Sequence, residues 1–229
     1  MNIQPNSFNV YKTISIHLKY PFFWTYLLIL HFKFYSRFPK LIIIDFILFL
    51  ARICFYFVTF LQTIFSLKGN KRSSEFTYGE LSYHGLESIY QTLNLDPNLT
   101  IVDLGSGCGK VLFYSSLKYQ VKSVGVDING FYTYFTKLIS SLLFIPVSCH
   151  CQNFLKDPLP PGDIVFVPTT CLSENTIQTL SNHISNSYPR NTIIISTSIA
   201  LPTNQFLLTN RIRVIFSWGY GHIYVHKLI

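Results

Sequence analysis

From residue 81 to its end, the chain alternates between two hydrophobic patterns, one typical of amphipathic helices and one of buried strands. Short runs rich in apolar residues predict the strands of a mostly parallel sheet, at residues 101–104, 121–126, 147–151, 163–167 and 192–198. Apolar residues at helical spacing predict helices before and between them, at residues 81–93, 111–118, 132–144 and 173–187. Two further runs predict a hairpin, with strands at residues 214–217 and 222–225 and a turn at 218–221. This order predicts an α/β fold with an open, doubly wound, mostly parallel seven-stranded sheet.

The residues before this domain form an apolar segment that we expect to be helical. Residues 22–32 carry no formal charge, and residues 41–67 consist almost entirely of aliphatic and aromatic side chains. Because a helix needs about 20 apolar residues to cross a bilayer, the first run is too short, and the second contains Asp45 and Arg52. These two lie seven residues apart, on one helical face, where their charges can neutralise each other. Three arrangements stay open: a helical hairpin in or partly inserted into a bilayer, one spanning helix, or two helices packed on the protein's own sheet or in an oligomer.

The formal net charge of +8 belongs entirely to this N-terminal segment. Residues 1–72 contain nine basic residues and one acid, whereas the remainder contains nine of each. A neutral α/β domain lacks the basic face that nucleic acid requires, so the charge favours a membrane surface as partner instead. A polar stretch at 69–74 divides the chain into a basic, membrane-associating segment, 1–69, and an α/β domain, 70–229. The five cysteines are scattered and odd in number, which indicates a reducing compartment and no metal site.

Most of the candidate chemistry lies in the run that follows the first predicted strand. Asp103 precedes a loop of alternate glycines that lets the backbone pass close beneath a ligand, formed by Gly105, Ser106, Gly107 and Gly109. The second strand ends in Asp127, where a carboxylate suits the two hydroxyls of a ribose. A dinucleotide fold reads G-x-G-x-x-G, and an acid before its first glycine would repel a pyrophosphate but attract a cation. The spacing therefore favours S-adenosylmethionine, which carries a sulfonium and an ammonium, over NAD.

The ends of the third and fourth strands add further candidates, because ligands of open α/β sheets lie beyond the carboxyl ends of the strands. We expect Asn153 to bond the adenine amino group and Phe154 to pack on the adenine ring. Pro168 and Thr169 follow the fourth strand in the same way. The titratable side chains expected near this cleft are Glu80, His84, Cys171 and Glu174, and none of them forms a pattern that identifies a catalytic base.

Three segments of the chain resemble one group of methyltransferases. Asp103–Val111 looks like the first motif of the class I S-adenosylmethionine-dependent methyltransferases, which have a Rossmann-like sheet. Together with Thr77–Glu80 and Asp163–Val167, it resembles the non-SET histone-lysine methyltransferases of the telomeric-silencing-disruptor type and small bacterial relatives, over roughly residues 74–200. The family has paired asparagines and an aromatic residue after the fourth strand, whereas this chain has Thr169-Thr170-Cys171 and no basic nucleosome-binding tail. The resemblance therefore implies the fold and the cofactor, but it supports neither a histone substrate nor lysine as the acceptor.

The resemblance also implies that Tyr78 and Glu80 form a lid over the cofactor, although Thr77 and Glu80 equally fit the capping box of a helix. The sequence thus predicts a membrane-associated S-adenosylmethionine-dependent methyltransferase whose catalytic domain lies in the cytosol. Its acceptor stays open among a protein, a lipid and a lipophilic small molecule. The alternatives are a non-catalytic membrane scaffold that retains the fold and, disfavoured by the glycine spacing, an NAD-dependent oxidoreductase. The residues predicted to bind the cofactor are Tyr78, Glu80, Asp103, Gly105, Ser106, Gly107, Gly109, Asp127, Asn153, Phe154, Pro168 and Thr169.

Overall fold

The computed structural model describes residues 25–26, 29–65, 80–170, 172–217 and 219–229, without the side chains of residues 52 and 54–65. The predicted domain boundary, the linker at 69–74, Thr77, Tyr78 and Cys171 all lie outside the described residues.

The seven-stranded sheet predicted from the sequence is confirmed. Its strands run in the order β3-β2-β1-β4-β5-β7-β6, with β7 antiparallel to both of its neighbours and the others parallel. The strands are β1 (Thr100–Leu104), β2 (Lys122–Asp127), β3 (Val147–Cys151), β4 (Ile164–Val167), β5 (Ile193–Thr197), β6 (Phe206–Phe216) and β7 (Gly219–Leu228). The strand order reverses between β1 and β4, which is where an open α/β sheet opens a crevice for a ligand.

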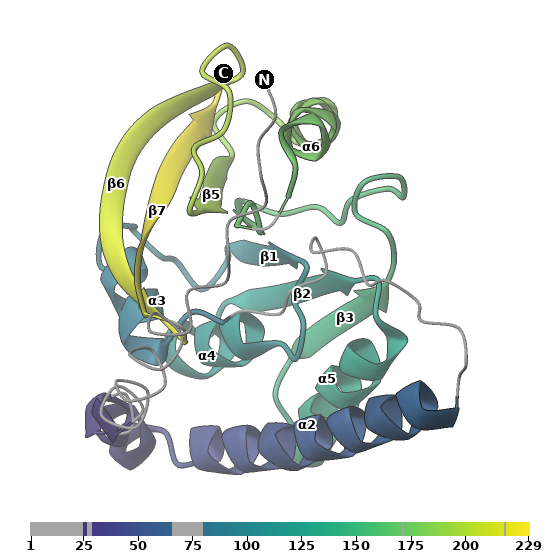
Figure 1. Ribbon diagram of the computed structural model, residues 1–229. Helices are drawn as coiled ribbons and strands as arrows, with labels where there is room; N and C mark the ends of the chain where they lie inside the picture. The colour runs from purple at the N-terminus through teal and green to yellow at the C-terminus, as the bar shows by residue number, and fades with distance from the viewer. Residues whose placement is uncertain (1–24, 27–28, 66–79, 171, 218) are drawn as a thin grey trace, which may run out of the picture.

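Helices cover both faces of the sheet (Figure 1). On one face lie α3 (Tyr83–Tyr90), α4 (Lys110–Tyr119) and α5 (Gly130–Leu143), whose apolar side chains form one buried cluster with the sheet. The other face carries α6 (Glu174–Ser187), which packs Ile177, Leu180 and Ile184 against a second cluster. The predicted helices and strands between residues 100 and 198 all occur within one or two residues of their expected bounds.

Two predicted parts of the chain have the wrong bounds. The helix expected over residues 81–93 spans only Tyr83–Tyr90, and it begins at Tyr83 because Ser82 caps it by accepting a hydrogen bond from the Gly85 N–H at 3.0 Å. The hairpin strands are longer than predicted and meet in a tighter turn, with Phe216 paired to Gly219. β6 is an edge strand whose residues 207–211 are exposed, and the three apolar residues that begin it, Phe206 to Leu208, are followed by Thr, Asn and Arg, so its first half lacks the alternation of a half-buried strand.

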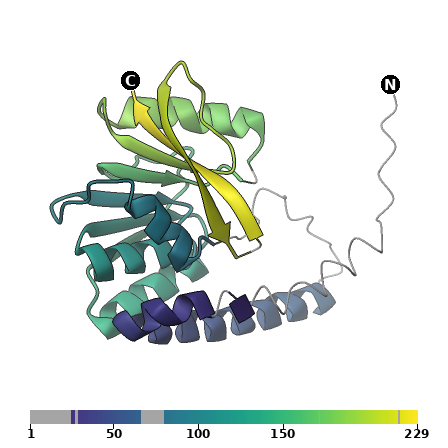
Figure 2. The ribbon, with the colours of Figure 1, turned by 90° about the vertical axis from the view of Figure 1, so that its left-hand side faces the viewer.

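The N-terminal helices pack on the α/β domain. A helix over residues 29–37 precedes α2 (Lys40–Phe65), and both lie beneath the layer of α4 and α5 (Figure 2). One face of α2 is buried in the same cluster as α3 and α4, through Leu41, Ile44 and Leu48. The Asp45 carboxylate accepts hydrogen bonds from two tyrosines, Tyr35 (2.6 Å) and Tyr83 (2.9 Å), and its predicted partner Arg52 has a side chain outside the described part of the chain. These helices contact the helical layer, His31 at Tyr83 of α3, Phe34 at Tyr114 of α4, and α2 at α5. Within the part of the chain that the structure describes, no helix combines the length and apolar character that crossing a membrane requires.

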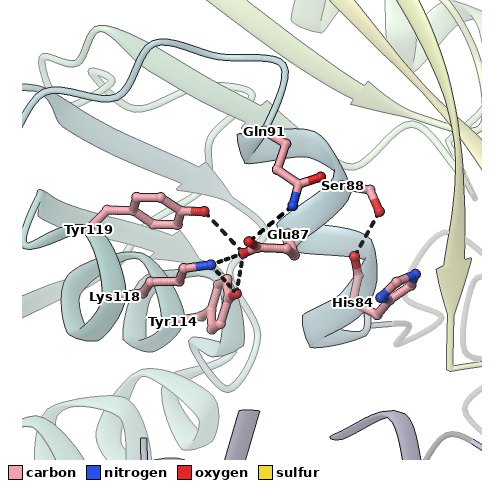
Figure 3. A network of polar contacts seen from close by, with 7 residues as sticks. All are labelled: His84, Glu87, Ser88, Gln91, Tyr114, Lys118 and Tyr119. Carbon is pink, nitrogen blue, oxygen red and sulfur yellow. Dashed lines mark hydrogen bonds and ion pairs between the residues drawn. The ribbon is translucent and has the colours of Figure 1, made fainter. Parts of the chain in front are cut away.

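A polar network joins α3 to α4 (Figure 3). The Glu87 carboxylate accepts hydrogen bonds from Tyr114 (2.6 Å), Tyr119 (3.1 Å) and the ammonium of Lys118. Burial alone would raise the pKa of Glu87, but the bonds from Lys118 and Tyr114 outweigh it and lower this pKa. The network fixes α3 against α4, and both helices begin beside the carboxyl ends of the central strands.

Candidate active site

The glycine loop after β1 has the left-handed backbone geometry that its sequence predicts. Gly105, Gly107 and Gly109 have φ angles of +74°, +51° and +77°, in the left-handed region that side chains disfavour. The N–H groups of Gly105 and Ser106 both donate to the Val126 carbonyl, at 2.7 and 3.0 Å, so the loop is fixed to the end of β2. A Cβ atom at Gly105 would lie 3.0 Å from the Pro168 ring. The loop therefore passes closely between the ends of β2 and β4.

Asp127 lies at the carboxyl end of β2 and is hydrogen-bonded to this loop. Its Oδ2 accepts the Gly107 N–H at 2.7 Å, and its Oδ1 accepts the Asn129 N–H at 2.7 Å. Burial raises the pKa of Asp127, and these two backbone bonds partly offset the increase. Each carboxylate oxygen accepts a single described bond and keeps a lone pair. The side chain is thus held in a fixed position and can still accept hydrogen bonds from the two hydroxyls of a ribose.

Asp103 is a buried acid with no compensating charge among the described residues. Its side chain is only 8% exposed, and no described residue makes a hydrogen bond or ion pair with its carboxyl group. Burial, together with repulsion from Asp127, raises the pKa of Asp103 to about 8. An acid in this condition favours any cation that binds beside it, because the cation stabilises the ionised form.

The remaining predicted residues fall into two groups. Phe154 and Pro168 are brought to the glycine loop, since both rings would contact a Cβ placed on Gly105. Asn153 and Thr169 are engaged within the protein. The Asn153 Oδ1 accepts the Leu155 N–H at 3.0 Å, and the buried Thr169 hydroxyl bonds to the carbonyl oxygens of Thr197 and Ile199.

Glu80 lies beside the loop and is paired with the first residue of α4. Its Oε2 is 3.6 Å from the Lys110 ammonium, which also lies 4.5 Å from the centre of the Tyr83 ring. The Glu80 carbonyl accepts a hydrogen bond from the Ser217 N–H at 2.8 Å, which attaches the backbone at Glu80 to the end of β6. Because Ser82 caps α3, Glu80 is not the third residue of a capping box on that helix.

None of the other titratable candidates identifies a catalytic base. Glu174 and His84 are exposed, and the described contact of His84 is its backbone carbonyl, which accepts from Ser88 (Figure 3). Within the described ranges, no group of three or more His, Cys, Asp and Glu side chains has the geometry of a metal site.

Two residues of this region were missed by the sequence prediction. A Cβ atom on Gly125, in β2, would lie 2.6 Å from Ser106 Oγ and from Leu112, so this glycine makes room for the loop. A glycine inside an apolar strand is the signal that could have found it. His31 is buried beside Tyr83, with ring centroids 4.9 Å apart. Its sequence neighbourhood is an uncharged apolar run and gave no such signal.

The site thus offers a fixed carboxylate, an uncompensated acid and two rings around a glycine loop. These groups fit a nucleoside with a nearby positive charge, which is the chemistry of S-adenosylmethionine. With the strand order, they define the class I S-adenosylmethionine-dependent methyltransferase fold.

Comparison with known proteins finds one matching family. Residues 57–144, less than half of the chain, are similar to the family described as "Histone methylation protein DOT1". A curated relative, the "Histone-lysine N-methyltransferase, H3 lysine-79 specific" of Eremothecium gossypii, is 39% identical over 59 residues. That match covers 26% of this chain and only 10% of the relative.

Solved structures share the fold at low identity. An RNA methyltransferase from Salinibacter ruber in complex with S-adenosyl-L-homocysteine is 13% identical, with a TM-score of 0.53 over 62% of this chain and 89% of that one. The magnesium protoporphyrin IX methyltransferase of Synechocystis PCC 6803 with bound SAM is 15% identical, with a TM-score of 0.52 over 63% of this chain and 78% of the other. At this identity the likeness establishes the fold, and the reaction has to be argued from the site.

Proposed function

We propose that this protein is an S-adenosylmethionine-dependent methyltransferase that works at a membrane surface. The observation that carries the enzymatic part is the pair of acids at the glycine loop. Asp127 is oriented by the Gly107 N–H, and Asp103 is buried without a partner among the described residues. A scaffold that had lost its ligand would gain nothing from two acids that raise each other's energy in a buried site.

The residues of this chain have to bind, orient and enclose the cofactor. Asp127 suits the ribose hydroxyls, Asp103 suits the cationic part, and Phe154 and Pro168 form an apolar wall at the loop. The cofactor itself supplies an electrophilic methyl group on a sulfonium. Catalysis then depends mainly on alignment and on the exclusion of water, and a base is required only when the acceptor must first lose a proton. We therefore assign no catalytic base.

The membrane part of the proposal rests on the outer face of α2. This outer face consists of apolar side chains that are 45–59% exposed: Ile42, Ile43, Phe46, Phe49, Leu50 and Ile53. A contiguous exposed apolar face on a helix indicates a partner surface. The Lys40 ammonium donates to the Leu143 carbonyl at 2.8 Å, which places the end of α5 beside the start of α2. Phe144, 90% exposed, extends the apolar area there.

The charges around the outer face favour a lipid surface as its occupant. Lys33, Arg37 and Lys40 are exposed next to it, while the nearest acid, Asp45, is bonded to tyrosines on the inner side. Apolar side chains flanked by bases are the combination that binds anionic lipid headgroups and the acyl boundary below them. We infer that the acceptor is held at the same surface, as a lipid, a lipophilic small molecule or a membrane-bound protein.

The cofactor site is tested by calorimetric titration of S-adenosylmethionine into the full chain. We expect micromolar binding that Asp127→Ala weakens at least about tenfold, because the ribose loses a charged hydrogen-bond acceptor. Asp96→Ala is the matched control. Asp96 is an exposed acid that precedes the amino end of β1, whereas the candidate site lies at the carboxyl ends of the strands. If the folded wild type binds no cofactor, the enzymatic proposal is wrong and the scaffold alternative replaces it.

The membrane surface is tested by flotation of the full chain with neutral phosphatidylcholine vesicles and with vesicles that also contain phosphatidylglycerol. We expect flotation with the anionic vesicles, lost when Phe46 and Phe49 are both changed to Asp. Leu207→Asp is the control, because Leu207 is 54% exposed on the distant edge strand β6. Equal flotation of the double variant, or none by the wild type, would overturn this part and leave the cofactor titration unaffected.

A further inference from the structure

The helix over residues 29–37 places a buried histidine, His31, beside the cofactor site. His31 is 9% exposed, and its ring lies 4.9 Å from the Tyr83 ring and 5.9 Å from the Tyr35 ring. Its Nε2 atom is buried and has no hydrogen-bond partner in the described part of the chain. A buried polar atom without a partner costs free energy, so its retention points to a ligand that supplies the missing bond.

The neighbours of His31 are the charged pair at the entrance of the glycine loop. The Tyr83 ring that contacts His31 also lies 4.5 Å from the Lys110 ammonium, and Lys110 is paired with Glu80. Burial, together with the nearby Lys110 and His84, lowers the pKa of His31 to about 3, although Glu80 opposes the shift. At neutral pH His31 is therefore an uncharged imidazole whose Nε2 can form one hydrogen bond.

The chemical match for this group is a zwitterion. Lys110 directly follows Gly109, so the paired Lys110 and Glu80 side chains lie at the end of the glycine loop. An ammonium and a carboxylate held 3.6 Å apart complement a ligand that carries one carboxylate and one ammonium on neighbouring atoms. The α-amino-acid end of S-adenosylmethionine has this arrangement, whereas the adenosine end does not.

We propose that His31 is a further cofactor-binding residue, which donates from Nε2 to the carboxylate of the α-amino-acid end of the cofactor, next to Lys110. The inference rests on the proposed function, since it takes S-adenosylmethionine as the ligand of the loop. If His31 binds the cofactor in this way, the helix over residues 29–37 forms one wall of the active site. The helix is held in that position by the Tyr35 and Tyr83 bonds to Asp45.

The test compares two ligands in the full chain, S-adenosyl-L-homocysteine and 5′-methylthioadenosine, by calorimetry. Both carry the adenosine part, and only the first has the amino-acid end. His31→Phe keeps a ring of similar size and removes the nitrogen. We expect it to weaken S-adenosyl-L-homocysteine about tenfold, as for the loss of one hydrogen bond to a charged group, and to leave 5′-methylthioadenosine unchanged. His31→Gln, which keeps an N–H donor, should restore most of the affinity.

Ser36→Ala is the matched control, because it removes a hydrogen bond on the exposed side of the same helix, from the Ser36 hydroxyl to the Lys33 carbonyl at 3.1 Å. If His31→Phe weakens both ligands equally, or if Ser36→Ala reproduces its selective loss, His31 has only a packing role and the inference is wrong. Failure of the wild type to bind S-adenosyl-L-homocysteine or S-adenosylmethionine would instead overturn the proposed function, and this inference with it. If the Phe variant does not fold, His31→Gln and His31→Ala replace it. The inference is then supported if His31→Gln binds 5′-methylthioadenosine as tightly as the wild type does, and if His31→Ala loses affinity for S-adenosyl-L-homocysteine only.

Discussion

The buried acid Asp103 makes a quantitative prediction about protons. Its pKa is raised to about 8 by burial and by Asp127, so at pH 7 about nine-tenths of the cofactor-free molecules carry this proton. A positive charge bound about 4 Å away contributes on the order of 4 kcal/mol at an effective dielectric constant of about 20, which lowers the pKa by about 3 units. Binding of S-adenosylmethionine at pH 7 should therefore release close to one proton from Asp103.

This release also fixes how affinity depends on pH. Below its pKa, Asp103 must lose its proton before it can act on the cation, so the affinity should rise about tenfold from pH 6 to pH 7 and level off above pH 8. The stability of the cofactor-free protein has the opposite trend. Because the folded-state pKa is raised, this protein loses stability as the pH rises from the unfolded-state pKa near 4 towards 8.

Calorimetry at pH 7.0 in buffers of different ionisation enthalpy measures the number of protons directly. Asp103→Asn is the control, because it removes the carboxyl group that binds the proton and keeps a side chain of the same size. We expect the variant to bind more weakly and to release about one proton fewer. The same proton release in wild type and variant, or none in the wild type, would refute the assignment of a protonated Asp103.

Two further predictions concern the structure around the site. Gly125→Ala should weaken cofactor binding at least about tenfold and lower the Tm, because the new Cβ would lie 2.6 Å from Ser106. Gly130→Ala is the control and should leave the affinity and the Tm unchanged, because no described atom would lie nearer than 3.7 Å to its Cβ. Equal effects of the two substitutions in thermal-shift and binding assays would contradict the close-approach argument. Glu87→Gln should cost about 1–2 kcal/mol of unfolding free energy in urea at pH 7, since Lys118 and two tyrosines lose a carboxylate. Its pKa is lowered on folding, so this cost should shrink as the pH falls below about 4, and a pH-independent difference would count against it.

The sequence predicted the sheet well because each central strand and each crossover helix has a complete local signature. The glycine loop and Asp127 were found for the same reason, since a turn of alternate glycines and an acid at a strand end have no common packing role. The first half of β6 was missed because its apolar run, Phe206 to Leu208, is short and the exposed polar residues after it do not alternate with apolar ones. His31 was missed for a different reason. Its role depends on Tyr83 and Lys110, which are distant in sequence, and no local pattern encodes that contact.

Helix α2 is apolar on both sides, and this has a consequence for how it is oriented. Hydrophobicity alone does not select which side of such a helix turns inward, because either side buries similar area. Asp45 removes the ambiguity, since its carboxylate reaches Tyr35 and Tyr83 in only one rotation of the helix about its axis. A single polar residue thus determines the rotation of α2 about its axis. It directs Leu41, Ile44 and Leu48 to the protein interior and leaves the outer face of α2 turned away from it.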